Sequence, residues 1–174
     1  ALSLARLLCA LGLTLASAAG LALPQHNPVP GGVAVIDLGV AGAMPPTARW
    51  GEQPLAVLRD GGRWFALLGI PLDTLPGTLE ISVFSGSTAT ALSVPVHVKN
   101  YPEQRLTIKD KREVEPNADD LARSEREREV TEAIKRRFSD AAPATDFALP
   151  ASGPLSSRFG LRRVFNGQPR NPHA

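Results

Sequence analysis

Residues 78–84 read Thr-Leu-Glu-Ile-Ser-Val-Phe, and apolar side chains alternate with polar ones along this stretch. Successive side chains of a β-strand point to opposite faces, so a period of two is typical of a strand with one face in a core. Leu79, Ile81 and Val83 are therefore expected on the buried face. This stretch predicts that the surrounding unit is built from antiparallel strands.

The same alternation follows immediately downstream. Leu92, Val94, Val96 and Val98 occupy every second position and are expected on the core face of a second strand. Pro95 lies between them and has no backbone N–H to give to a neighbouring strand. Proline in a strand is confined to edges and bulges, so this strand is predicted at the edge of its sheet.

Shorter apolar runs lie upstream at residues 33–38, 55–58 and 63–70. Asp60-Gly61-Gly62 separates the last two, and glycine tolerates the positive φ that a tight hairpin requires. Short strands with turn signals between them indicate an all-β unit. Residues 24–102 are therefore predicted to form a small Ig-like β-sandwich domain in a mainly β chain.

The composition changes sharply after Pro102. Residues 103–146 are predicted to be a linker that contains a charged helix near residues 117–138, in which Arg and Glu alternate and apolar residues are few. Asn117 is expected to cap its N-terminus, because a short polar side chain there can accept a hydrogen bond from a free backbone N–H. Residues 105–110 either pair with a strand or run along a surface.

Residues 1–23 are typical of an export signal. Arg6 supplies the positive charge, residues 7–15 form an apolar run, and residues 16–18 read Ala-Ser-Ala, which predicts cleavage near Ala18. An uncleaved signal is the alternative, and it is the only contact with a membrane that the sequence predicts. Cys9 is the single cysteine and lies inside the apolar run, so no disulfide is expected in the exported part.

The charge balance argues against nucleic acid as a partner. Nineteen basic and seventeen acidic residues give a net charge of +2, and the charges alternate in sign instead of clustering. A phosphate-binding surface needs concentrated positive charge. The three histidines, His26, His97 and His173, have no spacing that brings two of them to one face, and none would be more than an ordinary histidine on this evidence alone.

Residues 147–174 are too few to bury a core of their own without a disulfide or a metal. Strands are expected at residues 147–150 and 155–159, and the segment is predicted to be the incomplete start of a further domain. Residues 156–162 read Ser-Ser-Arg-Phe-Gly-Leu-Arg, and Pro172-His173-Ala174 follow.

This combination resembles the opening of the lysostaphin-type (LytM-like) zinc endopeptidase domain, in which such a segment precedes a Pro-His that begins a His-x-x-x-Asp pair of zinc ligands. Residues 69–73, Gly-Ile-Pro-Leu-Asp, and residues 101–108, Tyr-Pro-Glu-Gln-Arg-Leu-Thr-Ile, resemble the β-rich N-terminal domain of Gram-negative members. The resemblance covers residues 31–174.

The resemblance implies an enzyme of the cell envelope of a Gram-negative bacterium, periplasmic or secreted. In this family zinc activates water for attack on the peptide cross-links of peptidoglycan, and peptidoglycan peptides are the implied partner. His173 would be the first Zn²⁺ ligand. Whether Arg162 or Arg163 lines the substrate cleft stays open.

The Asp of the ligand pair and the family's later His-x-His, which includes a catalytic histidine, do not occur here. The resemblance therefore places the catalytic residues beyond Ala174, and we expect a fragment that is inactive alone and does not bind zinc stably. The alternative is a non-catalytic periplasmic module that binds or regulates a cell-wall hydrolase or another envelope protein. A pilus or adhesin subunit is a third reading, disfavoured because no donor-strand extension is evident.

Overall fold

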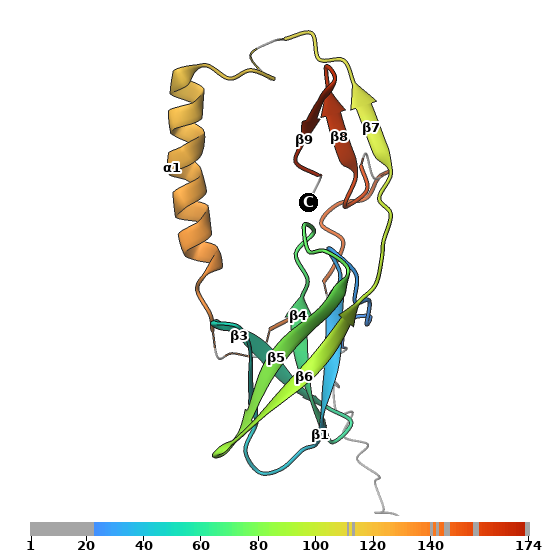
Figure 1. Ribbon diagram of the computed structural model, residues 1–174. Coiled ribbons are helices and arrows are strands. Elements are labelled where there is room, and N and C mark those ends of the chain that lie inside the picture. Colours follow the sequence, from blue (N-terminus) through green and yellow to red (C-terminus); the bar gives the residue numbers. More distant parts are fainter. Residues whose placement is uncertain are drawn as a thin grey trace, which may run out of the picture.

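A computed structural model of the chain describes residues 23–110, 112, 114–139, 141, 143–144, 147–154 and 157–172. These residues form a six-stranded sheet, a smaller three-stranded sheet and one helix that stands to the side of both (Figure 1). The predicted mainly β class with a linker helix is confirmed. The elements are β1 (Val33–Val40), β2 (Thr47–Trp50), β3 (Gln53–Asp60), β4 (Arg63–Gly69), β5 (Gly77–Ser85), β6 (Thr88–Val96), β7 (Glu103–Leu106), α1 (Ala118–Lys135), β8 (Arg162–Phe165) and β9 (Gln168–Arg170).

Strand β3 joins the two halves of the large sheet, whose strand order is β1-β4-β3-β2-β5-β6. Residues 53–55 pair with β2, whereas residues 56–60 pair with β4. A strand that changes partners along its length lets a sheet turn a corner, so that its two halves face each other as in a sandwich. All the pairs within this sheet are antiparallel.

The core lies between these halves and receives side chains from all six strands. Leu68 of β4 and Ile81 of β5 are the largest side chains that are fully buried. The buried cluster consists of Ala34, Ala48, Leu55, Ala66, Leu68, Ile70, Ile81, Val83, Val94 and Val96.

The alternation in residues 78–84 predicts the burial in β5 correctly, since Ile81 and Val83 are buried and Leu79 packs against the core. The prediction for Val98 is wrong, because this side chain is 71% exposed. Strand β6 ends at Val96, which pairs with Gly77 at the start of β5, so the ladder has no partner for residues beyond it. Pro95 lies in β6 at the sheet edge, as predicted.

The turn between β3 and β4 also forms as expected. Gly61 and Gly62 both have positive φ, 52° and 76°, which is the backbone of a two-residue hairpin turn. Strand β2 is not evident in the sequence, because its four residues include two that are exposed and one that is half-buried. It pairs with both β3 and β5 and completes the large sheet.

Helix α1 begins after Asn117, whose side chain accepts a hydrogen bond from the backbone N–H of Asp120 at 2.9 Å. It ends at Lys135, three residues before the predicted limit. None of its residues is buried, and the apolar side chains Val130 and Ile134 are 61% and 58% exposed. The helix therefore contributes no buried side chain to the core.

The strands expected in the last segment are placed wrongly. Residues 147–150 are not in a strand, and Phe147 and Leu149 are more than four-fifths exposed. Leu155 and Ser156 lie outside the described residues, and the chain from Ser157 to Gly160 bends and turns. The strands that form in this segment are β8 and β9. Strand β8 pairs with both β7 and β9.

Residues 1–22, which hold most of the predicted export signal together with Cys9, also lie outside the described residues. Within the described part of the chain, no helix has the length and apolar character needed to cross a membrane.

The core can be tested with a matched pair of leucines. Leu68 is 1% exposed and Leu75 is 83% exposed. Leu68→Ala removes buried methyl groups and leaves a cavity, so we expect the free energy of unfolding to fall by about 2–5 kcal/mol. Leu75→Ala should change it by less than about 0.5 kcal/mol. Urea unfolding of both variants measures the difference, and equal midpoints would contradict this placement of the core.

Candidate metal centre

The segment that carries the sequence motif forms a β-hairpin. Ser157-Arg158-Phe159-Gly160 make a turn, and β8 and β9 follow. Asn166 and Gly167 connect the two strands with φ values of 49° and 81°, which is the backbone that an Asn-Gly hairpin turn adopts. This dipeptide is a sequence signal for a hairpin that could have identified both strands.

The hairpin tip is held against the chain that follows β7. The Asn166 side chain accepts a hydrogen bond from the N–H of Ile108 at 2.9 Å and donates one to the carbonyl oxygen of Ile108 at 3.0 Å. Its own backbone N–H donates to the carbonyl of Leu106 at 3.0 Å. Strand β7 pairs with β8 in parallel, so residues 103–106 form a strand with a distant partner. This settles which of the two alternatives holds for that segment.

The two arginines of the motif have different surroundings. Arg162 donates to Glu103 at 3.1 Å across the β7–β8 pair, so its charge is engaged in holding the sheet. Arg163 donates to the Ser157 hydroxyl at 3.2 Å, and its Nε is buried without a hydrogen bond to any described residue. Of the two, Arg162 is exposed, whereas the Nε of Arg163 is shielded from solvent.

A third arginine has a structural role that the sequence does not single out. Arg170 faces Arg163 across the β8–β9 pair, and its guanidinium donates to the carbonyl oxygen of Val114 and to the side chain of Gln168, each at 2.7 Å. Val114 is buried. Arg170 thereby fastens the chain before α1 to the end of the hairpin. Such a contact between residues 56 positions apart leaves no local signal in a sequence.

The predicted zinc ligand His173 and the final residue Ala174 both lie outside the described residues, and Pro172 before them is exposed. The expectation that the catalytic residues fall beyond Ala174 therefore stays a prediction. Among the described residues, no three His, Cys, Asp or Glu side chains are grouped so that they could hold a metal ion. Catalytic zinc takes three protein ligands. The described residues do not make up a zinc site, and no catalytic step through zinc is derived from them.

The other two histidines have structural surroundings. His26 is exposed, but its Nδ1 lies 3.0 Å from the backbone nitrogen and 3.1 Å from the carbonyl oxygen of Val35 in β1. Nδ1 accepts from the N–H in the tautomer that leaves it without a hydrogen and donates to the carbonyl in the tautomer that places a hydrogen on it. His97 is exposed just beyond β6, as predicted, and its backbone N–H donates to Pro28 at 2.8 Å.

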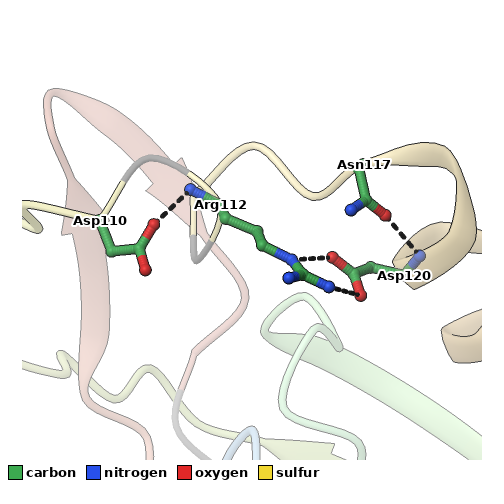
Figure 2. Close-up of polar contacts among 4 residues, drawn as sticks. All are labelled: Asp110, Arg112, Asn117 and Asp120. Carbon is green, nitrogen blue, oxygen red and sulfur yellow. Dashed lines mark hydrogen bonds and ion pairs between the residues drawn. The ribbon is translucent and has the colours of Figure 1, made fainter.

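A cluster of polar side chains fixes the start of α1. Figure 2 shows the guanidinium of Arg112 facing both carboxylate oxygens of Asp120, at 2.7 and 2.8 Å. The backbone N–H of Arg112 donates to Asp110 at 2.9 Å, and Asn117 caps the helix beside it. The hydrogen bond from Arg112 is the main reason that the pKa of Asp120 is held below its ordinary value, and the same contact raises the pKa of Arg112.

Comparison with known proteins finds similarity in the β domain and beyond it. Residues 26–101 match the model of the peptidase family M23 N-terminal domain. A crystal structure from Pseudomonas aeruginosa, of a protein assigned to peptidase family M23, is 38% identical in sequence, with a TM-score of 0.62. The match covers 78% of this chain and 52% of that one, so this chain spans about half the length of the solved structure. No curated protein matches the chain.

The polar cluster at the helix start predicts a pH dependence. Because the folded state lowers the pKa of Asp120, the ion pair stabilises the fold at pH values above the ordinary carboxyl pKa and is lost as the pH falls through the lowered one. In Arg112→Gln, the pKa of Asp120 should rise towards its ordinary value, and this end of the helix should fray.

Carbon-13 NMR titration of the aspartate carboxyl groups measures this shift. Arg126→Gln is the matched control, since Arg126 lies on the same exposed helix and makes no ion pair with a described residue. An unchanged Asp120 titration in Arg112→Gln would rule out the ion pair of Figure 2.

Proposed function

We propose that this chain, which is related to the LytM-like peptidases of family M23, is part of an exported zinc endopeptidase that cuts peptide cross-links of peptidoglycan. The observation that carries the proposal is the extent of the similarity. The structural match covers 78% of the chain at 38% identity, whereas residues 26–101 alone are less than half of it. The similarity thus extends beyond the β domain, towards the segment that ends in Pro172-His173-Ala174.

The first residues support the cellular location in this proposal. An apolar run after Arg6, followed by Ala-Ser-Ala at residues 16–18, is typical of a signal that directs export and is then removed. A peptidase exported across the inner membrane of a Gram-negative bacterium meets the peptidoglycan in the periplasm. The cell envelope is therefore the proposed location, and the peptides of the wall are the proposed partners.

In this proposal the described residues hold the hairpin that precedes the proposed zinc ligand. The hairpin β8–β9 leads directly to His173 and is held at its tip by Asn166, at its start by the Arg162–Glu103 pair and at its end by Arg170. A hairpin that is held at three places is a rigid support, and rigid supporting elements favour a preorganised site. When bound, zinc would lower the pKa of a water molecule to about 7 and make it a nucleophile. Arg163 supports the start of the hairpin through its hydrogen bond to the Ser157 hydroxyl.

The role of His173 can be tested in the full-length protein. In His173→Ala we expect the zinc content and the cleavage of wall peptides to fall together, because two remaining ligands cannot hold zinc in a tetrahedral site that also binds water. His97→Ala is the matched control, since His97 is an exposed histidine of the β domain. It should retain both properties.

If His173→Ala keeps its zinc and cleaves normally, the proposed ligand is wrong. A full-length protein that binds wall fragments or another hydrolase but cuts nothing would instead support the non-catalytic alternative.

The 174-residue chain itself should be inactive. It holds one of the ligands that the family uses, and catalysis at an open zinc site needs three. Incubation of the purified chain with peptidoglycan and added zinc should release no soluble muropeptides above a zinc-free control. Zinc-dependent release by this chain would contradict the prediction and would show that its own residues complete a site, with none needed beyond Ala174.

A further inference from the structure

Two aromatic rings and two glycines meet where the β domain adjoins the motif segment. We propose that Tyr101 is a positioning residue that, together with Phe159, fixes the β domain on the segment leading to His173. We name the contact of Gly31, Tyr101, Phe159 and Gly160 the aromatic interlock. The role in catalysis rests on the proposed function, whereas the interlock itself can be tested without any enzymatic activity.

Tyr101 connects the two parts directly. Its hydroxyl donates a hydrogen bond to the carbonyl oxygen of Pro30 at 2.7 Å, which ties it to the loop before β1. Its ring meets that of Phe159 edge to face, with centroids 6.4 Å apart and an angle of 74° between the planes. Aromatic rings prefer this arrangement because the positive edge of one faces the negative face of the other. The ammonium group of Lys99 lies 4.8 Å from the centroid of the Tyr101 ring and adds a cation–π contact.

Phe159 rests on a glycine of the β domain. A Cβ atom at Gly31 would lie 2.6 Å from the Phe159 ring and 2.8 Å from the side chain of Leu72, so only glycine leaves room for this ring. Gly31 also has a φ of 75°, which L-residues rarely adopt, and its N–H donates to the carbonyl oxygen of Ile70 at 2.9 Å. The loops before β1 and after β4 thus form the surface on which the Phe159 ring packs.

Tyr101 packs on a glycine of the motif in the reciprocal way. Gly160 is buried and has a φ of 80°, and a Cβ atom there would overlap the Tyr101 ring. Each side of the interlock therefore presents an aromatic ring to a glycine of the other side. In the motif Ser-Ser-Arg-Phe-Gly, Phe159 and Gly160 are engaged with the β domain, which assigns them a docking role instead of contact with a substrate.

The connection between the two parts would be loose without this contact. Residues 97–102, between β6 and β7, contain no helix or strand. Domains joined by such a link move relative to one another unless an interface holds them. The interlock lies at the end of this link and gives the β domain one orientation on the segment that carries the candidate ligand.

The chain has a single tyrosine, which makes the interlock accessible to a direct test. Biosynthetic incorporation of 3-fluorotyrosine gives one fluorine-19 resonance that reports on Tyr101 alone. In the folded chain this resonance should be displaced from its position in urea. In Phe159→Ala it should move towards the urea position, because the ratio of docked to undocked chain should fall roughly two- to tenfold. Gly160→Ala should move the resonance in the same direction. If the glycine variant does not fold, Phe159→Ala still tests the interlock.

Phe147→Ala is the matched control, because Phe147 belongs to the same segment but is 82% exposed. It should leave the resonance in place. If the resonance is identical in the wild type, Phe159→Ala and Gly160→Ala, the interlock does not form and the proposal is overturned. This outcome is independent of zinc and of peptidase activity.

The positioning role is tested by a double-mutant cycle in the full-length protein. Phe159→Ala and Tyr101→Ala each break the same contact, so the double variant should lose no more kcat than either single variant, with KM nearly constant. If Phe159 instead contacted the substrate, the two losses would multiply and KM would rise. That result would overturn the positioning role even where the fluorine data show that the interlock forms.

Discussion

The parallel pairing of β7 with β8 is the constraint on which the second half of this molecule depends. Residues 103–106 pair with residues 162–165, on the far side of α1 and its linkers, and Asn166 adds a backbone hydrogen bond to Leu106. Parallel strands cannot be joined by a tight turn and need a crossover, which α1 provides here. Glu103 reinforces the pair by accepting from Arg105 at 2.7 Å and from Arg162 at 3.1 Å. Without this pairing, β7 would have no partner strand among the described residues, and Asn166 would lose its contacts with Leu106 and Ile108.

This arrangement explains how a helix without buried residues can be part of an ordered structure. Helices in globular proteins draw most of their stability from packing an apolar face, which α1 does not do in the described residues. Instead the start of α1 is fixed. Asn117 caps its start, and Arg112 holds Asp120 in the first turn, where a carboxylate also interacts favourably with the helix dipole. Ion pairs between Arg123 and Glu127 and between Arg128 and Glu125 follow along its surface. Exposed ion pairs of this kind each contribute little to stability. The contacts that Asn117 and Arg112 make with Asp120 are therefore the ones that set where α1 begins.

The parts of the fold that could be predicted from the sequence are those with a local physical signature. Alternation along residues 78–84, the double glycine at residues 61–62 and the cap at Asn117 each reflect contacts or dihedral angles within a few residues. Strands β2 and β8 have four residues each and no clear alternation, and each pairs with a strand that is distant in the chain as well as with a neighbouring one. The Asn166-Gly167 turn is a local signal for the β8–β9 hairpin, whereas the pairing of β8 with β7 has none. The candidate site shows the same limit. His173 is identified only through the resemblance of its surroundings, because a lone histidine has no pattern of its own. The apolar residues Leu155 and Phe159 predict a strand over residues 155–159, but the ring of Phe159 packs on Gly31 and Tyr101, both far away in sequence. No periodicity can reveal a contact of that kind.

The size of the aromatic interlock has a consequence for how the β domain can act on the rest of the protein. The aromatic pair across the interlock is worth on the order of 1 kcal/mol, which shifts an equilibrium by roughly fivefold and does not lock it. The docked arrangement is then favoured and remains reversible. A ligand of the β domain could release the motif segment only if it binds the undocked form more tightly than the docked form. At saturation, the factor by which it shifts the equilibrium towards the undocked form would equal the ratio of its two affinities. Since the loop of Pro30 and Gly31 carries one side of the interlock, a ligand that contacts this loop is the kind that can make such a distinction.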